Sequence, residues 1–189
     1  MKKIEIKGKR NIDKVFNPNK KHERKIAIDY ENKNKIDFKS YNTKSQIQLI
    51  NKLYMNLFFD EREILEKEIK KKHYGYKQQD IQKNILDNEK LISIPDIYEK
   101  LVASKLKCFY CSTHVSILYK NVRENNQWTL DRINNDYGHN YNNVVICCLK
   151  CNVKRKTMDS EKFKFTKTLK IVKKNDNILN NGNNNMDKK

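Results

Sequence analysis

Apolar side chains recur at helical spacing over residues 44–58, where they alternate with Lys, Gln and Asn. This i, i+3, i+4, i+7 pattern predicts an amphipathic helix with one packed face. Residues 60–69 continue as a second helix, because its acids come early and Lys70 to Lys72 come late, as the helix dipole favours. Residues 79–87 predict another short helix. The apolar positions of the first helix are Ile47, Ile50, Leu53, Tyr54, Leu57 and Phe58.

A further helix is predicted just before the first cysteines of the chain. Pro95 and Asp96 suit a first helical turn, where proline needs no N–H partner and an acid meets the positive end of the dipole. Ile97, Leu101 and Val102 follow at helical spacing. This helix should deliver the chain to Cys108.

The second half of the chain alternates short apolar runs with helical signals. Residues 128–133 and 144–147 predict two strands, the first ending in an acid, and a helix opens at residues 148–152. Ser160 is a plausible N-cap for a helix through about residue 173. The predicted fold class is therefore α+β. We expect a basic, largely helical region over 1–104, a module over 105–173, and a disordered Asn- and Lys-rich tail over 174–189.

The charge balance adds a candidate partner. The chain has 189 residues, with 41 Lys and Arg against 23 Asp and Glu, and a net charge of +18. Such an excess favours a polyanion, nucleic acid above all. A general over-use of Asn, Lys and Ile explains the charge equally well. No apolar run reaches the length of a membrane span, and the Lys-rich start lacks a secretory apolar core, so we expect a soluble protein.

Two Cys-x-x-Cys pairs predict a metal site. Cys108 and Cys111 form the first pair, and Cys148 and Cys151 form the second. The two-residue gap lets both sulfurs of a pair reach one tetrahedral ion, and thiolates suit Zn²⁺. Four sulfurs leave no open position, so this zinc should be structural. Cys147 is the spare cysteine, predicted to face away and be buried. Five cysteines without a secretory signal indicate a reducing compartment inside the cell, either cytoplasm or nucleus.

The segment 105–165, roughly a third of the chain, resembles the zinc-bound branch of the HNH endonuclease family. The likeness rests on the first cysteine pair, Leu130-Asp131 at a strand end, Asn143 before Val-Val-Ile, and Cys148-Leu-Lys-Cys-Asn152 with a trailing Lys156. The Asp-Arg-Ile core is also similar to HNH proteins of phages and large DNA viruses. The resemblance implies a ββα-metal fold that cuts DNA, in a viral genome or a mobile element.

The resemblance also implies roles for individual residues. Asp131 and Asn152 would hold one catalytic Mg²⁺ or Mn²⁺, since a carboxylate and an amide oxygen are hard ligands. Asn143 would fix the loop between the strands by hydrogen bonds. The basic run that follows the second cysteine pair is expected to contact the DNA backbone. This run consists of Lys154, Arg155 and Lys156.

One position departs from the family pattern. The family's general base is the His after the Asp, and here that position is Arg132, which stays protonated near neutral pH. Three interpretations remain open. In the first, His139 supplies the imidazole from the loop. In the second, a metal-bound water or an unrecognised group acts as the base while Arg132 grips the scissile phosphate. In the third, the site is inactive and the module only binds DNA.

Three functions follow from these alternatives. The first is a metal-dependent DNA endonuclease that hydrolyses a phosphodiester and leaves a 5′ phosphate. The second is a zinc-stabilised DNA-binding module without activity. The third is a protein-interaction domain whose lysines reflect composition alone. Placement of His139 within one water of the Asp131–Asn152 metal site would favour the first.

Overall fold

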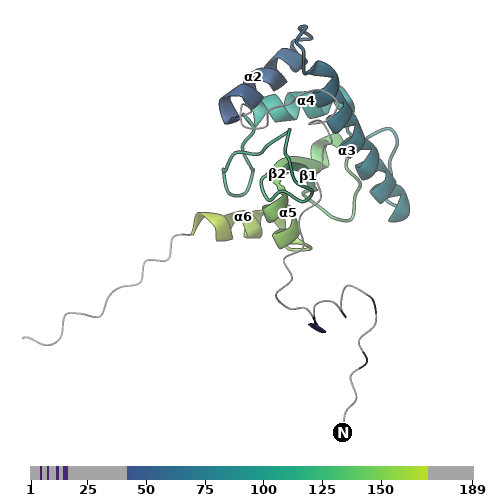
Figure 1. Ribbon diagram of the computed structural model, residues 1–189. Coiled ribbons are helices and arrows are strands. Elements are labelled where there is room, and N and C mark those ends of the chain that lie inside the picture. The colour runs from purple at the N-terminus through teal and green to yellow at the C-terminus, as the bar shows by residue number, and fades with distance from the viewer. Residues whose placement is uncertain (1–4, 6–7, 9–11, 13–14, 17–41, 170–189) are drawn as a thin grey trace, which may run out of the picture.

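The computed structural model describes residues 42–169, together with residues 5, 8, 12, 15 and 16. Helices α2, α3 and α4 lie together at one end, and a β-hairpin with α5 and α6 forms the other end (Figure 1). The predicted α+β class is confirmed. The predicted tail over 174–189 and nearly all of residues 1–41 lie outside the described residues. The element bounds are α2 Thr43–Tyr54, α3 Arg62–Gln82, α4 Ile94–Ala103, β1 Trp128–Arg132, β2 Val144–Cys148, α5 Leu149–Arg155 and α6 Ser160–Thr168.

Helix α2 is shorter than its apolar pattern predicts. It begins at the cap Asn42, whose side chain accepts a hydrogen bond from the Ser45 N–H. It ends because Asn56 adopts a left-handed φ of 56° and the Leu57 N–H bonds back to Lys52 O, a Schellman-type closure. Phe58, predicted to be in the helix, lies beyond it and is 90% exposed.

Helix α3 is one continuous element of 21 residues. The separate short helix predicted over 79–87 is wrong, because residues 79–82 form the last turn of α3. The intervening stretch is rich in Lys and Gln, which favour helix, and Tyr76 is buried in its middle. The helix stops where Asn84 adopts a φ of 55° and the Ile85 N–H bonds to Asp80 O.

Helix α4 begins as its sequence predicts. Ser93 Oγ accepts from the Asp96 N–H, and the Asp96 carboxylate accepts from the Ser93 N–H in return. Pro95 lies in the first turn, where its missing N–H costs nothing. Ile97 and Leu101 are fully buried, and the chain then reaches Cys108.

Strands β1 and β2 pair antiparallel, with Trp128 opposite Cys148 and Asp131 opposite Val145. Helix α5 follows β2 without a loop, since the Cys148 side chain itself caps its first turn. The order strand, strand, helix is therefore present. Every residue of β1 is buried, because helices cover one face of the hairpin and α5 lies against the other.

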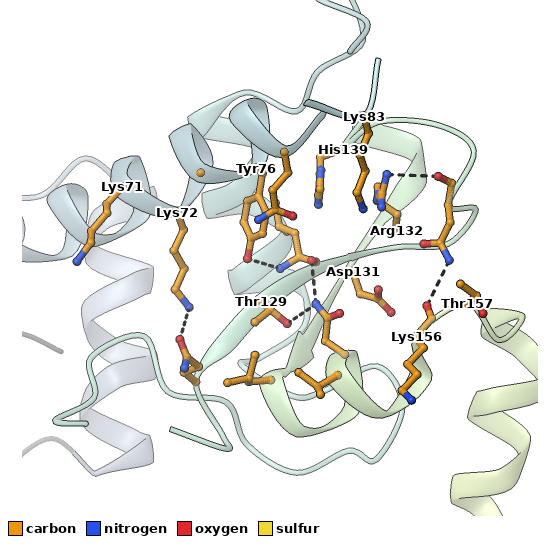
Figure 2. Close-up of a pocket in the computed structure, with 18 residues that line it drawn as sticks. Lys71, Lys72, Tyr76, Lys83, Thr129, Asp131, Arg132, His139, Lys156 and Thr157 are labelled. Carbon is orange, nitrogen blue, oxygen red and sulfur yellow. Dashed lines mark hydrogen bonds between the residues drawn. The ribbon is translucent and has the colours of Figure 1, made fainter. Parts of the chain in front are cut away.

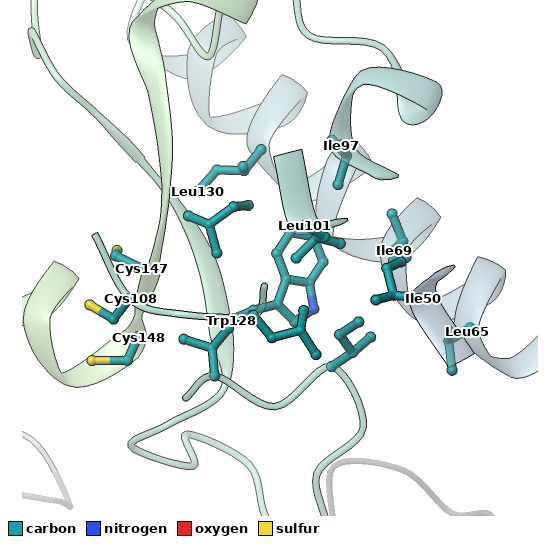
Figure 3. Close-up of a cluster of buried hydrophobic side chains, with 14 of the residues drawn as sticks. Ile50, Leu65, Ile69, Ile97, Leu101, Cys108, Trp128, Leu130, Cys147 and Cys148 are labelled. Carbon is teal, nitrogen blue, oxygen red and sulfur yellow. The ribbon is translucent and has the colours of Figure 1, made fainter. Parts of the chain in front are cut away.

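The core is continuous across the hairpin and the helices. The Trp128 ring lies between Leu101 and Ile69 on the helical side and the buried cysteines, Cys108 and Cys148, on the other (Figure 3). A buried Trp removes a large apolar area from water. Buried residues on both sides of the boundary at 104 belong to the same cluster. The helices and the hairpin therefore pack as one body around Trp128.

The N-cap of helix α6 lies one residue earlier than predicted. Asp159, and not Ser160, is the N-cap, and its carboxylate accepts from the Lys162 N–H. Phe163 is buried, and its ring meets the Tyr110 ring edge-on at 5.0 Å. The helix ends at Thr168 and Leu169 is already extended, so the predicted extension towards 173 is wrong at residue 169, and residues 170–173 lie outside the described residues. Within the described residues, no helix combines the length and apolar character needed to span a bilayer.

Candidate functional site

Four cysteines gather at the end of the hairpin, as the sequence predicts. The sulfurs of Cys108, Cys111, Cys148 and Cys151 all lie within 4.8 Å of one another, and the Cys111 and Cys148 sulfurs are 3.9 Å apart. A tetrahedral ion with Zn–S bonds of about 2.3 Å holds its sulfurs about 3.8 Å apart. The four thiols therefore fit a metal ion such as Zn²⁺, which would join the 108–111 knuckle to the β2–α5 junction.

Cys147 is not part of this cluster. It is fully buried on β2, and the Thr129 hydroxyl lies 3.1 Å from its sulfur. Burial raises the pKa of the Cys147 thiol well above its usual value, so it stays protonated. The prediction that Cys147 is a buried small hydrophobe is confirmed.

A cleft of about 740 Å³ opens between α3 and the hairpin with α5 (Figure 2). Asp131, Arg132, His139, Asn152 and Lys156, all predicted from the sequence, line it together. Within residues 42–169, the cationic side chains of this lining come from both walls. They are Lys71, Lys72, Lys83, Arg132 and Lys156. The cleft is therefore a concave, positively charged surface, which suits phosphate groups.

His139 is buried beside the cleft and held on two sides. Its Nδ1 lies 2.8 Å from Asp80 Oδ1, and its ring stacks on Tyr76 with centroids 4.6 Å apart. Burial lowers the pKa of His139 below its usual value, although the Asp80 carboxylate opposes this. His139 is therefore neutral at pH 7 and can accept a proton.

Arg132 follows Asp131 on β1 and is almost fully buried. Its guanidinium donates to the Asn135 and Tyr137 carbonyls and lies 3.9 Å from Asp80. These contacts place its charge beside the ring of His139 at the cleft wall (Figure 2). Since guanidinium cannot accept a proton, Arg132 can contribute only charge and hydrogen bonds.

Asp131 is bound to Arg155 in a buried ion pair. Arg155 Nε donates to Asp131 Oδ2 at 2.6 Å and Arg155 Nη2 donates to Oδ1 at 3.0 Å. The Tyr110 hydroxyl donates to Oδ2 at 2.6 Å as well. Arg155 also donates to the Arg132 and Met158 carbonyls. The pair therefore ties β1, α5 and the first cysteine knuckle together.

This pair corrects the expectation that Arg155 contacts DNA. Arg155 is 2% exposed, because position 155 falls on the inward face of α5, four residues after Cys151. Lys154 and Lys156 are exposed, as predicted, and Lys156 also lines the cleft. The basic run therefore divides into one structural cation and two surface cations.

The same pair decides the fit of the expected Mg²⁺ or Mn²⁺ ion. A divalent ion needs carboxylate charge, and the Asp131 charge is already neutralised by Arg155. The Asn152 amide donates to Thr129 Oγ1 and Leu130 O, which turns its NH₂ group onto β1. Asp131 and Asn152 both reach the cleft, but in this arrangement their donor set carries no net charge. The catalytic ion expected at these residues does not fit it.

Asn143 fixes the loop between the strands. Its Oδ1 accepts from the Asn134 N–H, and its Nδ2 donates to the Asn134 and Gly138 carbonyls. These hydrogen bonds are those expected of Asn143, and they hold the loop that carries His139. Any role of Asn143 in a reaction stays a prediction.

Helix α3 supplies site residues that the sequence analysis missed. Asp80 and Tyr76 hold His139, and Lys72 donates to the Trp128 carbonyl and to Gln127 Oε1. Burial lowers the pKa of Lys72 to about 7. One signal was available for Asp80. It lies four residues after Tyr76 on the inward face of a helix, where an acid is unexpected.

Compared with protein-family models, curated proteins and solved structures, the chain gives no match.

Proposed function

We propose that this protein is an endonuclease that hydrolyses phosphodiester bonds of DNA in the cleft between α3 and the hairpin. The observation that carries the proposal is a buried histidine, His139, held by Asp80 and Tyr76 at the wall of a cationic cleft. Cationic side chains bind the phosphate backbone, and a held imidazole is the commonest general base. The resemblance of residues 105–165 to HNH endonucleases supports DNA as the substrate.

The residues divide the chemistry between them. Lys156 and Lys71, on opposite walls, would hold the backbone, and Arg132 would neutralise charge on the scissile phosphate. His139 Nε2 would take a proton from the attacking water. The water oxygen then bonds to phosphorus, the bond to the 3′ oxygen breaks, and that oxygen takes a proton from solvent. The product carries a 5′ phosphate.

Plasmid nicking also tests whether the reaction depends on a divalent metal ion. Because Arg155 neutralises Asp131, we expect added Mg²⁺ or Mn²⁺ to act only if it displaces the guanidinium. Nicking that requires one of these ions would support opening of the Asp131–Arg155 pair in the complex with DNA.

The proposal is tested by nicking of supercoiled plasmid with zinc-loaded protein, with and without added Mg²⁺ or Mn²⁺. We expect His139→Gln to lower the rate on the order of 10²- to 10⁴-fold, because it removes the base. His114→Gln is the matched control, since His114 is exposed and does not line the cleft. Absence of cleavage by wild type on supercoiled, linear and single-stranded DNA, in every ionic condition, would contradict the proposal.

A second function, a DNA-binding module without activity, is favoured by one observation. The buried pair between Asp131 and Arg155 uses the residue that the HNH family needs for its catalytic ion. Both functions predict that affinity falls as salt rises, through phosphate contacts such as those of Lys156. Salt dependence therefore does not separate them, whereas the nicking assay does.

A further inference from the structure

Asp80 is a fully buried acid whose two carboxylate oxygens both lie within hydrogen-bond distance of one distant residue, His139. It lies on α3 and is 0% exposed. Its Oδ2 accepts from the His139 backbone N–H at 2.6 Å, and its Oδ1 lies 2.8 Å from His139 Nδ1. The two residues are 59 positions apart in the chain. Burying a carboxylate costs free energy unless it is paired, and the hydrogen bonds to His139 offset that cost.

The two contacts fix the position of the imidazole proton. A carboxylate only accepts hydrogen bonds, and the Arg132 guanidinium lies 3.9 Å from this one. Nδ1 must therefore carry the hydrogen that points to Oδ1. In the neutral ring, the lone pair is then on Nε2, the nitrogen left for the cleft that His139 lines.

The ring plane is fixed as well. Tyr76, one turn before Asp80, stacks on the imidazole with 29° between the planes, and its hydroxyl accepts from the Leu130 N–H. Gly138 lets the loop approach α3 this closely. A Cβ at Gly138 would lie 2.7 Å from Ile85 O and 2.9 Å from Asp80 Oδ2. Any larger residue would push the loop, and with it the ring, away from the helix.

We infer that Asp80 is a positioning residue, which holds His139 in the tautomer whose Nε2 accepts a proton in the cleft. The inference rests on the proposed function, and it adds α3 to the catalytic unit. The helical region is then more than a support for the hairpin. The loop between β1 and β2 carries the imidazole of His139. Asp80 on α3 holds the proton on Nδ1, which leaves Nε2 as the basic nitrogen.

The other charged and titratable groups that face His139 do not fix its tautomer. Arg132 on β1 and Lys83, the C-cap of α3, both lower its pKa, and Tyr76 contributes only its ring face. Asp80 raises that pKa, but burial outweighs it. The imidazole therefore stays neutral while its proton is held on Nδ1.

Asp80→Asn separates this role from packing, because Asn has the same shape with one acceptor oxygen. The His139 N–H can only donate, so it claims that oxygen and turns the NH₂ group towards Nδ1. Nδ1 must then accept, and the proton moves to Nε2. We expect nicking to fall on the order of 10²- to 10⁴-fold while zinc content and melting temperature stay close to wild type.

The tautomer itself is read by ¹⁵N NMR of protein labelled at histidine, with the His139 signals identified from His139→Gln. We expect a protonated Nδ1 in wild type and a protonated Nε2 in Asp80→Asn. Asp87→Asn is the matched control, since Asp87 pairs with Lys90 outside the cleft. A wild-type ring protonated on Nε2 would overturn the inference, even if Asp80→Asn fails to fold.

The two proposals fail in different ways in this experiment. The expected tautomers without any nicking by wild type would remove the endonuclease, and with it the catalytic meaning of Asp80. Nicking by wild type with an unchanged tautomer and rate in Asp80→Asn would remove the positioning role and leave the endonuclease.

Discussion

Replacing Cys148 with Ser is expected to abolish metal binding and unfold the hairpin half of the protein. Cys148 belongs to the four-thiol cluster, caps α5 and pairs with Trp128 at the centre of the core. Binding of Zn²⁺ to such a site contributes roughly 10–16 kcal/mol near pH 7, against a total domain stability of about 5–15 kcal/mol. If the ion is lost with this thiolate, the protein loses more free energy of folding than the remaining core can offset. Zinc content by mass spectrometry and thermal melting by circular dichroism measure both effects.

Cys147→Ser is the matched control, one residue away on the same strand. Cys147 is buried outside the cluster, and the Thr129 hydroxyl can hydrogen-bond to the new Ser. We expect this variant to keep one zinc per chain and a cooperative melt. The reverse pattern, with zinc lost in Cys147→Ser and kept in Cys148→Ser, would overturn the ligand assignment.

The second large effect concerns the buried ion pair. Asp131→Ala should lower the free energy of unfolding by about 3–5 kcal/mol, because it leaves the Arg155 guanidinium buried without its counter-charge. The Tyr110 hydroxyl loses its acceptor in the same change. Urea denaturation of the zinc-loaded protein measures the cost.

The double variant Asp131→Leu with Arg155→Met is the control for this prediction. It removes both charges, so its cost should be clearly smaller than that of Asp131→Ala alone. A loss below about 1 kcal/mol in Asp131→Ala would contradict the structural role. Such a result would instead suit an open carboxylate that awaits a metal ion.

Local signals in the sequence were enough to predict part of this structure. The start of α4 follows from the reciprocal bonds of Ser93 and Asp96, and the thiol cluster follows from the spacing within each cysteine pair. These features depend on residues three apart in the chain. Because the partners are close in the chain, the sequence alone predicts these contacts.

Other features depend on the direction in which a side chain points from its helix, or on contacts between residues far apart in the chain. Lys154, Arg155 and Lys156 look like one basic patch, but the turn of α5 sends Arg155 inward to Asp131. The four-residue spacing from Cys151 to Arg155 indicates that Arg155 lies on the inward face of α5. The run of three cations instead suggests that all three are exposed. The contact of Asp80 with His139 joins two elements whose packing no local pattern specifies.

The central claim is that His139, neutral and held at the cleft, is the general base of phosphodiester hydrolysis. Its most direct test is the pH dependence of plasmid nicking under kcat/KM conditions from about pH 5.5 to about 8.5, with zinc content checked at each pH. A base acts only when deprotonated, and the pKa of His139 lies below its usual value of 6.5. We expect a rate that is flat above about pH 6.5 and falls about tenfold per unit at lower pH, a limb that His139→Gln lacks. A wild-type rate that keeps rising tenfold per unit from about pH 7 to about 8.5, or an acid limb that persists in His139→Gln, would contradict the account.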